Sequence, residues 1–258
     1  MQQAEELYRE GKLTEAIGSL QPFLRDHPSD KRARNFLFEL LCFAGEYERA
    51  RKQLAVLADD SQGSRFGIAF YLAALSAEVE RQAYYEEPAA EGQTPPATPP
   101  SSTSQPIAGS WNGKRFEGIR DMDARLGESL EFLAAGKYHR LPFRYLRRLE
   151  IAPPVKVRDL FWLPATMETS ADLGAMEYPS ILIPVLYPNT YLIDDDQTRL
   201  GRATEWAAGE DGREVPCGQR ILVFGDEEVP LLSIRTIDFD APAQDPPEQV
   251  AQEPAGDA

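Results

Sequence analysis

The sequence predicts an α+β protein, in which an all-helical N-terminal domain precedes a mixed, mostly antiparallel β-sheet domain. Three observations predict this class. Apolar residues recur with a fixed long period over the first 85 residues, and a Pro-rich stretch follows them. Beyond that stretch, short apolar runs alternate with Gly, Asn and Asp, which is typical of strands and turns. We therefore expect a helical domain at 1–85, a linker at 86–108, an α+β domain at 109–240 and a tail at 241–258.

The helical domain is predicted from a repeat of 34 residues. Five positions recur, namely Leu7, Gly11, Leu13, Ala16 and Leu20, which return as Leu41, Gly45, Tyr47, Ala50 and Leu54. This is the period of the tetratricopeptide repeat, a helix-turn-helix unit. The glycine suits the left-handed turn that ends the first helix of each unit. A further helix over about Phe66–Tyr85 is expected to follow the two units, and two unrelated amphipathic hairpins are the alternative interpretation.

A short array of such repeats exposes an apolar face that another domain, subunit or partner usually covers. Partners most often bind the inner face formed by the first helix of each unit. Here that face is predicted to carry Asn35, Phe36, Glu39, Cys42 and Phe43. These five residues are the candidate partner-binding surface. The alternative is that Phe36 and Phe43 only pack between helices.

The amino-acid composition limits which kinds of partner we expect for the protein and in which cellular compartment we expect it. The net charge is −15, and a field of that sign repels phosphate backbones and anionic membrane surfaces, so we expect neither nucleic acid nor membrane as a partner. A basic amphipathic helix is the partner that such a field would steer fastest. No apolar run has the length of a signal peptide or of the roughly 20-residue membrane span. The two cysteines are far apart and too few for a disulfide framework or a zinc cluster. The acidic charge suits a cytoplasmic protein, and we expect no metal or cofactor.

Two segments differ from the rest of the chain in composition. Residues 86–108 are rich in Pro, Ser and Thr, and residues 241–258 are rich in Pro, Gln and acidic residues without a basic one. Neither segment carries enough large apolar side chains to offset the entropy lost on ordering. We expect a flexible linker and a disordered acidic tail.

The α+β domain is predicted to contain one helix and several strands. The helix would begin at Asp121 or Asp123 and run to about Ala135, because Leu126, Leu130 and Leu133 share one helical face and Gly136 follows as a stop. The expected strands cover residues 115–119, a long bulged stretch at 138–151, residues 159–163, and an edge strand at 180–187 containing Pro184. A hairpin is expected between residues 219–224 and 231–239.

Asp121, Asp123 and His139 are the residues from which an enzyme could be built. An Asp-x-Asp pair can hold a divalent ion together with a substrate phosphate, but no Gly-rich phosphate loop accompanies it here. A helix-capping carboxylate paired with Arg125 explains the same residues, and we favour this structural interpretation. His139 has no Ser or Cys context that would mark a nucleophile.

Several blocks, taken in order, resemble the ImpE/TagJ family of accessory proteins of the bacterial type VI secretion system. They include the repeat around Leu40–Ala50 and the later residues Phe116, Asp121, Asp123, Arg125, Gly127, Arg158, Asp159 and Trp162. We expect these later residues to be structural, with Arg158 and Asp159 forming an ion pair under Trp162. The family pattern has further helix where this chain has its Pro-rich stretch, so the docking of the two domains does not follow from the resemblance.

The resemblance implies a non-enzymatic cytoplasmic adaptor. Such proteins bind an N-terminal helix of the small sheath subunit, of the TssB or VipA type, and thereby connect the contractile sheath with the ClpV ATPase that disassembles it. The alternatives are a hydrolase or transferase that uses Asp121, Asp123 and His139, and a self-associating scaffold that forms a homodimer through the open face of the repeats.

Overall fold

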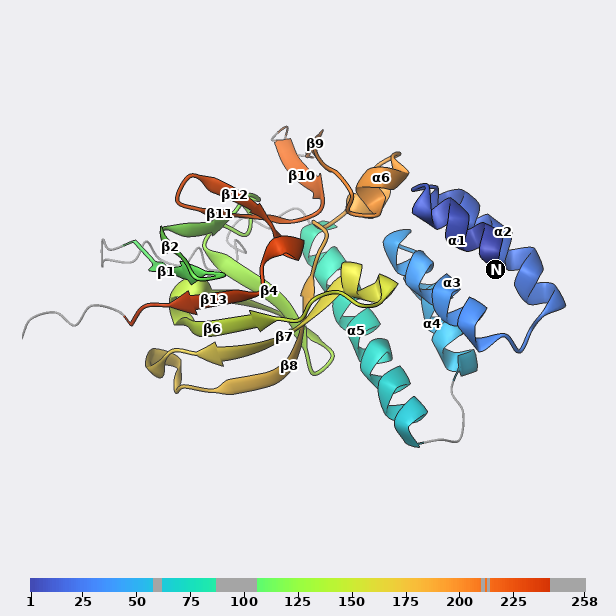
Figure 1. Ribbon diagram of the computed structural model, residues 1–258, viewed down its shortest axis with the longest axis horizontal. Helices are drawn as coiled ribbons and strands as arrows, with labels where there is room; N and C mark the ends of the chain where they lie inside the picture. Colours follow the sequence, from blue (N-terminus) through green and yellow to red (C-terminus); the bar gives the residue numbers. More distant parts are fainter. Residues whose placement is uncertain (58–61, 87–105, 210–211, 213, 242–258) are drawn as a thin grey trace, which may run out of the picture.

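The computed structural model describes residues 1–57, 62–86, 106–209, 212 and 214–241. In Figure 1 the helices α1–α4 lie on one side of the molecule and the strands on the other, with α5 between them. The helices are α1 (Gln2–Arg9), α2 (Leu13–Asp26), α3 (Lys31–Phe43), α4 (Tyr47–Leu57), α5 (Gln62–Glu86) and the short α6 (Asp196–Arg199). The predicted linker and tail fall almost wholly on 87–105 and 242–258, outside the described residues.

The predicted helical repeat is confirmed. Gly11 and Gly45 adopt φ values of +81° and +70° at the α1–α2 and α3–α4 turns, where only glycine is unstrained. Ala16 and Ala50 are fully buried where the helices of each unit cross. Asp30 caps α3 by accepting a hydrogen bond from the Ala33 N–H at 2.9 Å. The predicted third helical run is α5.

The strands form one large antiparallel sheet and two small ones. The strands are β1 (Ala108–Trp111), β2 (Lys114–Glu117), β3 (Ile119–Asp121), β4 (Ser129–Ala134), β5 (Lys137–Pro142), β6 (Leu146–Ile151), β7 (Trp162–Thr169), β8 (Glu177–Pro184), β9 (Thr204–Ala208), β10 (Glu214–Gly218), β11 (Ile221–Phe224), β12 (Glu227–Pro230) and β13 (Thr236–Phe239). The large sheet has the order β2-β1-β13-β6-β7-β8-β4-β5, and the small sheets are β12-β11-β3 and β10-β9. The α+β class is therefore confirmed.

The helix predicted from Asp121 or Asp123 to Ala135 is wrong. This stretch contains the end of β3, a turn and the strand β4. Residues 129–133 are all buried, because β4 is covered on both faces, so the strand lacks the polar alternation that marks a half-buried strand. Leucines three and four residues apart then imitate a helical face.

Three strand predictions also need correction. The long strand at 138–151 is broken into β5 and β6 by a 3-10 turn at Phe143–Tyr145. The strand that holds Pro184 is not at an edge, since β8 lies between β7 and β4, and Pro184 is tolerated because it ends the strand. The hairpin turn after β11 is as expected, but its second strand is β12, whereas β13 joins the large sheet.

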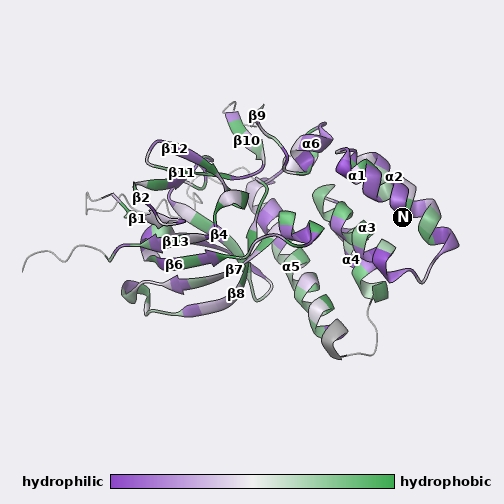
Figure 2. Ribbon diagram, viewed as in Figure 1, coloured by the Kyte–Doolittle hydropathy of each residue, from purple (hydrophilic) through white to green (hydrophobic). Residues whose placement is uncertain are grey.

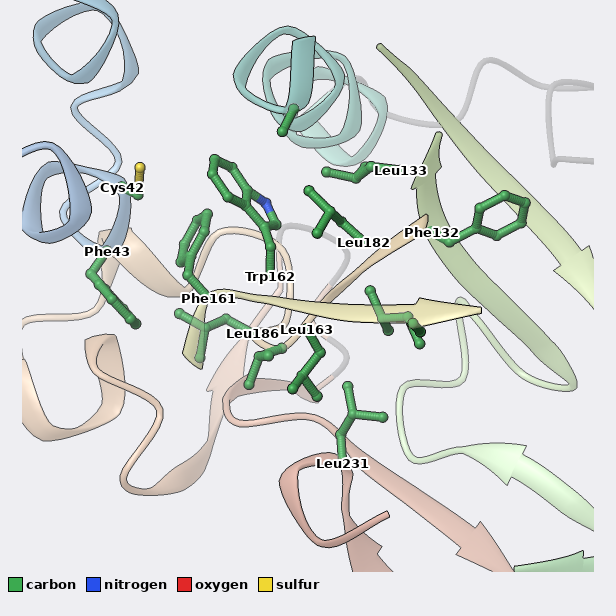
Figure 3. Packing of buried hydrophobic residues seen from close by; sticks show 14 of the residues in the cluster. Cys42, Phe43, Phe132, Leu133, Phe161, Trp162, Leu163, Leu182, Leu186 and Leu231 are labelled. Atoms are coloured by element: carbon green, nitrogen blue, oxygen red, sulfur yellow. The ribbon is translucent and has the colours of Figure 1, made fainter. Parts of the chain in front are cut away.

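A hydrophobic core continues from the repeats into the sheet. Phe43 of α3 packs edge-on against Phe161, with 5.2 Å between the ring centroids. Figure 3 shows Cys42 and Phe43 on one side of Phe161 and Trp162, and Leu182 on the other. In Figure 2 the middle of α5 is mostly hydrophobic, as expected of a helix with neighbours on two sides. The helical and sheet parts are thus packed as one body.

Candidate partner-binding groove

An open groove lies between the first helices of the two repeats and a loop of the sheet domain. Its volume is about 740 Å³. The lining residues come from α1, from α3 and from the loop before β7, and they are Met1, Glu5, Tyr8, Arg9, Arg32, Asn35, Phe36, Glu39, Val155, Lys156, Val157 and Arg158. This volume is large enough for side chains of a bound segment to enter.

Arg158 connects the two walls of the groove. Its Nη1 donates to Glu39 Oε1 at 2.9 Å and to Asn35 Oδ1 at 3.2 Å, and its guanidinium lies 4.7 Å from the Tyr71 ring centroid. Burial raises the pKa of Glu39 against the opposing effect of the Arg158 charge. The repeats and the sheet domain are therefore joined at the floor of the groove by a nearly buried ion pair.

The predicted ion pair between Arg158 and Asp159 is corrected by the structure. Arg158 pairs with Glu39 instead, while Asp159 Oδ2 accepts from the N–H groups of Val155 and Lys156 at 2.9 and 2.8 Å. Asp159 thus fixes the loop of residues 155–158, and Arg158 ties that loop to α3. The two neighbours have complementary roles in shaping the groove.

The five predicted partner-binding residues divide into two groups. Asn35, Phe36 and Glu39 line the groove. Cys42 and Phe43 do not, since each is only 1% exposed and is covered by the sheet domain. The expectation that these two side chains face a partner is not met, because α3 docks its C-terminal half on Phe161. The space beside them measures about 10 Å³, which is too small for a ligand.

Apart from Arg158, the groove residues outside α3 were not predicted from the sequence. Tyr8 packs edge-on against Phe36 with 5.7 Å between centroids, and Val155 projects into solvent with 83% exposure. The one available signal was an apolar residue after Pro153 and Pro154 in a segment that is otherwise a turn. Whether this apolar residue faces a groove depends on how the two domains dock, which the local sequence does not specify.

A second cluster of polar residues is buried between α5 and the sheet. Arg81 donates to Glu131 at 2.6 Å and to Glu78 at 2.9 Å, and Arg220 pairs with Asp121 at 2.7 Å and with Glu131 at 3.1 Å. All five side chains are at most 1% exposed. We call these residues the buried charge network. Figure 1 places α5 beside β4, the strand that supplies Glu131.

The network holds three carboxylates and two guanidiniums, so one negative charge is in excess. Burial raises the pKa of Asp121 to about 6, against the effect of Arg220. Burial would also raise the pKa of Glu131, but Arg81 and Arg220 together hold it below the usual range. Glu131 is therefore the charged centre of the network, and Asp121 is more easily protonated than Glu131.

The structure does not bring the candidate catalytic residues together. Asp121 accepts from the Asp123 N–H and from Arg220, and Asp123 binds Arg125 at 2.6 Å. The predicted Asp123–Arg125 pair is present, although no helix follows it to be capped. His139 is paired in register with Phe132 and stacks on its ring, on the face of the strands opposite to Glu131. Within the described ranges no three His, Cys, Asp or Glu residues are grouped to hold a metal ion.

Of the other residues of the family blocks, Phe116 and Trp162 lie in the interior and Gly127 lies in a bend. Phe116 packs against Phe224 with 5.0 Å between centroids, and Gly127 turns the chain with φ +54°. The Trp162 Nε1–H donates to Glu78 at 2.9 Å and so joins the sheet to α5. Of the helices that the structure describes, none is both long and apolar enough to span a bilayer.

Comparisons with known proteins agree with this architecture. A family model described as ImpE protein matches residues 113–238, and a tetratricopeptide repeat model matches residues 7–67. The chain is 32% identical over 263 residues to a Pseudomonas aeruginosa protein named type VI secretion system accessory component TagJ, covering 92% of this chain and 91% of that one. The crystal structure of protein VPA1032 from Vibrio parahaemolyticus has the same fold, with a TM-score of 0.78, 22% identity, and coverage of 93% of this chain and 98% of that chain.

Proposed function

Because the chain belongs to the ImpE/TagJ family of type VI secretion accessory proteins, we propose that it is a non-enzymatic adaptor that binds the N-terminal helix of the small sheath subunit. This subunit is of the TssB or VipA type. Through it the protein would connect the contractile sheath with the ClpV ATPase. The proposal places the protein in the cytoplasm, where the sheath assembles.

The observation that carries this proposal is the open groove on the inner face of the repeats. Repeat proteins bind extended or helical segments on this face, and a helix in a groove is held by a few apolar anchors. Tyr8 and Phe36 supply an aromatic floor, and the charged rim supplies orientation. Asp121 and Asp123 are each paired with an arginine and His139 stacks on Phe132 instead, which favours binding over chemistry as the function.

The test is calorimetric titration of the full chain with a synthetic peptide of the sheath subunit's N-terminal helix. Phe36→Ala should weaken binding about tenfold or more, because Phe36 is only 7% exposed and supports the Tyr8 ring at the floor of the groove, so its loss would disrupt the binding surface. Phe43→Ala is the matched control, because it removes the same side chain from the same helix outside the groove. It should lower the melting temperature and leave the affinity of the folded protein unchanged.

Two results would contradict the proposal. One is the absence of binding heat with the wild-type chain at peptide concentrations approaching the millimolar range. The other is equal loss of affinity for Phe36→Ala and Phe43→Ala in samples shown to be folded by circular dichroism, because that would place the binding site elsewhere.

A further inference from the structure

We infer that the groove is a composite site, in which Val155 and Lys156 of the sheet domain contact the same partner helix as Tyr8, Arg9 and Phe36 of the repeats. We further infer that this helix presents carboxylates beside an apolar anchor. The inference rests on the proposed function only in taking the sheath helix as the first occupant to test. Beyond the proposed function, it assigns a second wall to the site. It also specifies the charge of the partner side chains that the site would accept.

Val155 is held in solvent by its surroundings. The side chain is 83% exposed, although exposure of an apolar valine side chain to water is unfavourable. Two prolines precede it and restrict the backbone, and Asp159 accepts a hydrogen bond from its N–H. A rigid loop that presents an apolar side chain at the lip of a groove loses little entropy on binding, which is the property of an anchor contact.

The second wall is fixed relative to the first. Arg158 follows Val155 by three residues and reaches across to Glu39 and Asn35 of α3. Its side chain is 13% exposed and that of Glu39 is 6% exposed, so the pair is shielded from competing water. Val155 therefore stays at a set position opposite Phe36 and Tyr8, and the repeats alone do not carry the whole site.

The charges of the lining residues are unbalanced. Arg32 is matched by Glu5 at 2.7 Å, and Arg158 is matched by Glu39. Among the described residues no carboxylate pairs with the charged ends of Arg9 and Lys156, and both side chains line the groove. The groove thus offers two unmatched cations to an occupant, and carboxylates are their complement.

The overall charge of −15 favours the opposite choice, namely a basic helix. Ionic screening decides between a basic and an acidic partner helix, because the Debye length is about 8 Å at physiological ionic strength. Distant acidic residues are largely screened from the groove, whereas Arg9 and Lys156 are at contact distance from whatever enters it. Local pairing therefore sets the specificity of the site, and the net charge affects mainly the rate of encounter.

The experiment compares variants of the full chain against three peptides by calorimetry. One is the sheath N-terminal peptide. The other two are model amphipathic helices with the same leucine face, one with Glu and the other with Lys along its flanks. Val155→Asp should weaken binding of the sheath and Glu-flanked peptides about tenfold or more. Val56→Asp is the matched control, since Val56 is 58% exposed on α4 outside the groove, and its affinities should stay within about twofold of wild type.

Charge reversal tests the second part of the inference. Lys156→Glu and Arg9→Glu should each weaken binding of the Glu-flanked helix several-fold and strengthen binding of the Lys-flanked helix. The composite site is overturned if Val155→Asp binds every peptide as tightly as Val56→Asp does. The charge assignment is overturned if the wild-type chain prefers the Lys-flanked helix, or if the reversals leave the order of affinities unchanged.

These outcomes separate the inference from the proposed function. If the sheath peptide does not bind but the Glu-flanked helix binds in a Val155-dependent manner, the composite site stands and the proposed partner is wrong. If the sheath peptide binds in a manner that depends on Phe36 and is insensitive to Val155, the proposed function stands and the composite site is wrong. If no peptide binds, both are wrong.

Discussion

Arg81 lies at the junction of the helical repeats and the sheet, where its guanidinium bridges Glu78 on its own helix and Glu131 on β4. It also donates to the Leu186 carbonyl at 2.8 Å, so its donors are directed at three segments that are far apart in the sequence. A buried ion pair contributes little compared with an apolar contact of the same shape, but breaking one leaves a charge without a partner. Arg81 is therefore a residue whose loss is costly.

We predict that Arg81→Met lowers the free energy of unfolding by about 3–5 kcal/mol, because Glu131 and Glu78 would lose their shared cation inside the protein. Urea denaturation followed by circular dichroism measures this loss. Arg147→Met provides the comparison at the surface, since Arg147 and Glu168 form an exposed pair at 3.7 Å, and its unfolding midpoint should not move. Equal midpoints for the two variants would show that the buried charge network does not stabilise the fold.

At the scale of single elements, the sequence predicts what depends on local patterns. The repeat follows from coinciding positions such as Gly11 and Gly45, because a left-handed turn restricts the residue type regardless of what surrounds it. The strand β4 could not be recognised, because its burial on both faces comes from α5 on one side and other parts of the sheet domain on the other. A pattern of leucines indicates that the residues are buried. It does not indicate which element covers them, because that depends on the tertiary fold.

The β4–β5 turn packs closely against α5. Gly136 has φ +75°, and a Cβ atom there would lie 3.3 Å from the Ala73 Cβ of α5. We predict that Gly136→Ala destabilises the protein by more than the roughly 1–2 kcal/mol that an L-residue costs in the left-handed region. The additional loss arises because the helix must move away from the turn.

Gly113→Ala is the matched control for this prediction, since Gly113 has φ +82° in the β1–β2 turn and no atom lies within 4 Å of the added Cβ. The two variants share the backbone cost and differ in the contact with α5. Thermal unfolding of both measures the difference between them. Identical losses would mean that the turn yields freely and that α5 is not held at this point.

For the whole molecule, the groove exists only because the two parts dock. Asn35, Phe36 and Glu39 were predicted as a surface from the repeats alone, whereas Arg158 and Val155 reach them from a loop more than a hundred residues later. No local pattern encodes such a distance, and the predicted linker hid the docking by suggesting independent domains. The shared core around Phe43, Phe161 and Trp162 shows why the parts do not behave independently.

This docking predicts that the chain stays together when it is cut between the two parts. With a protease site inserted within residues 87–105, the cleaved fragments should elute as one species of the original mass in gel filtration with light scattering.

Three sets of contacts cross the cut. They are the Arg81–Glu131 pair, the Trp162–Glu78 hydrogen bond and the contacts of α2 with α6, where the Thr14 N–H donates to Asp196 at 3.0 Å. The Arg81–Glu131 pair and the Trp162–Glu78 hydrogen bond are buried, whereas the Thr14–Asp196 hydrogen bond is exposed, so mainly the buried contacts and the shared core should hold the fragments without a covalent connection. Urea should separate them in the same transition that unfolds the sheet. Two peaks in native buffer would show that the parts are held together mainly by the chain, and a groove built from both of them would then lack a fixed shape.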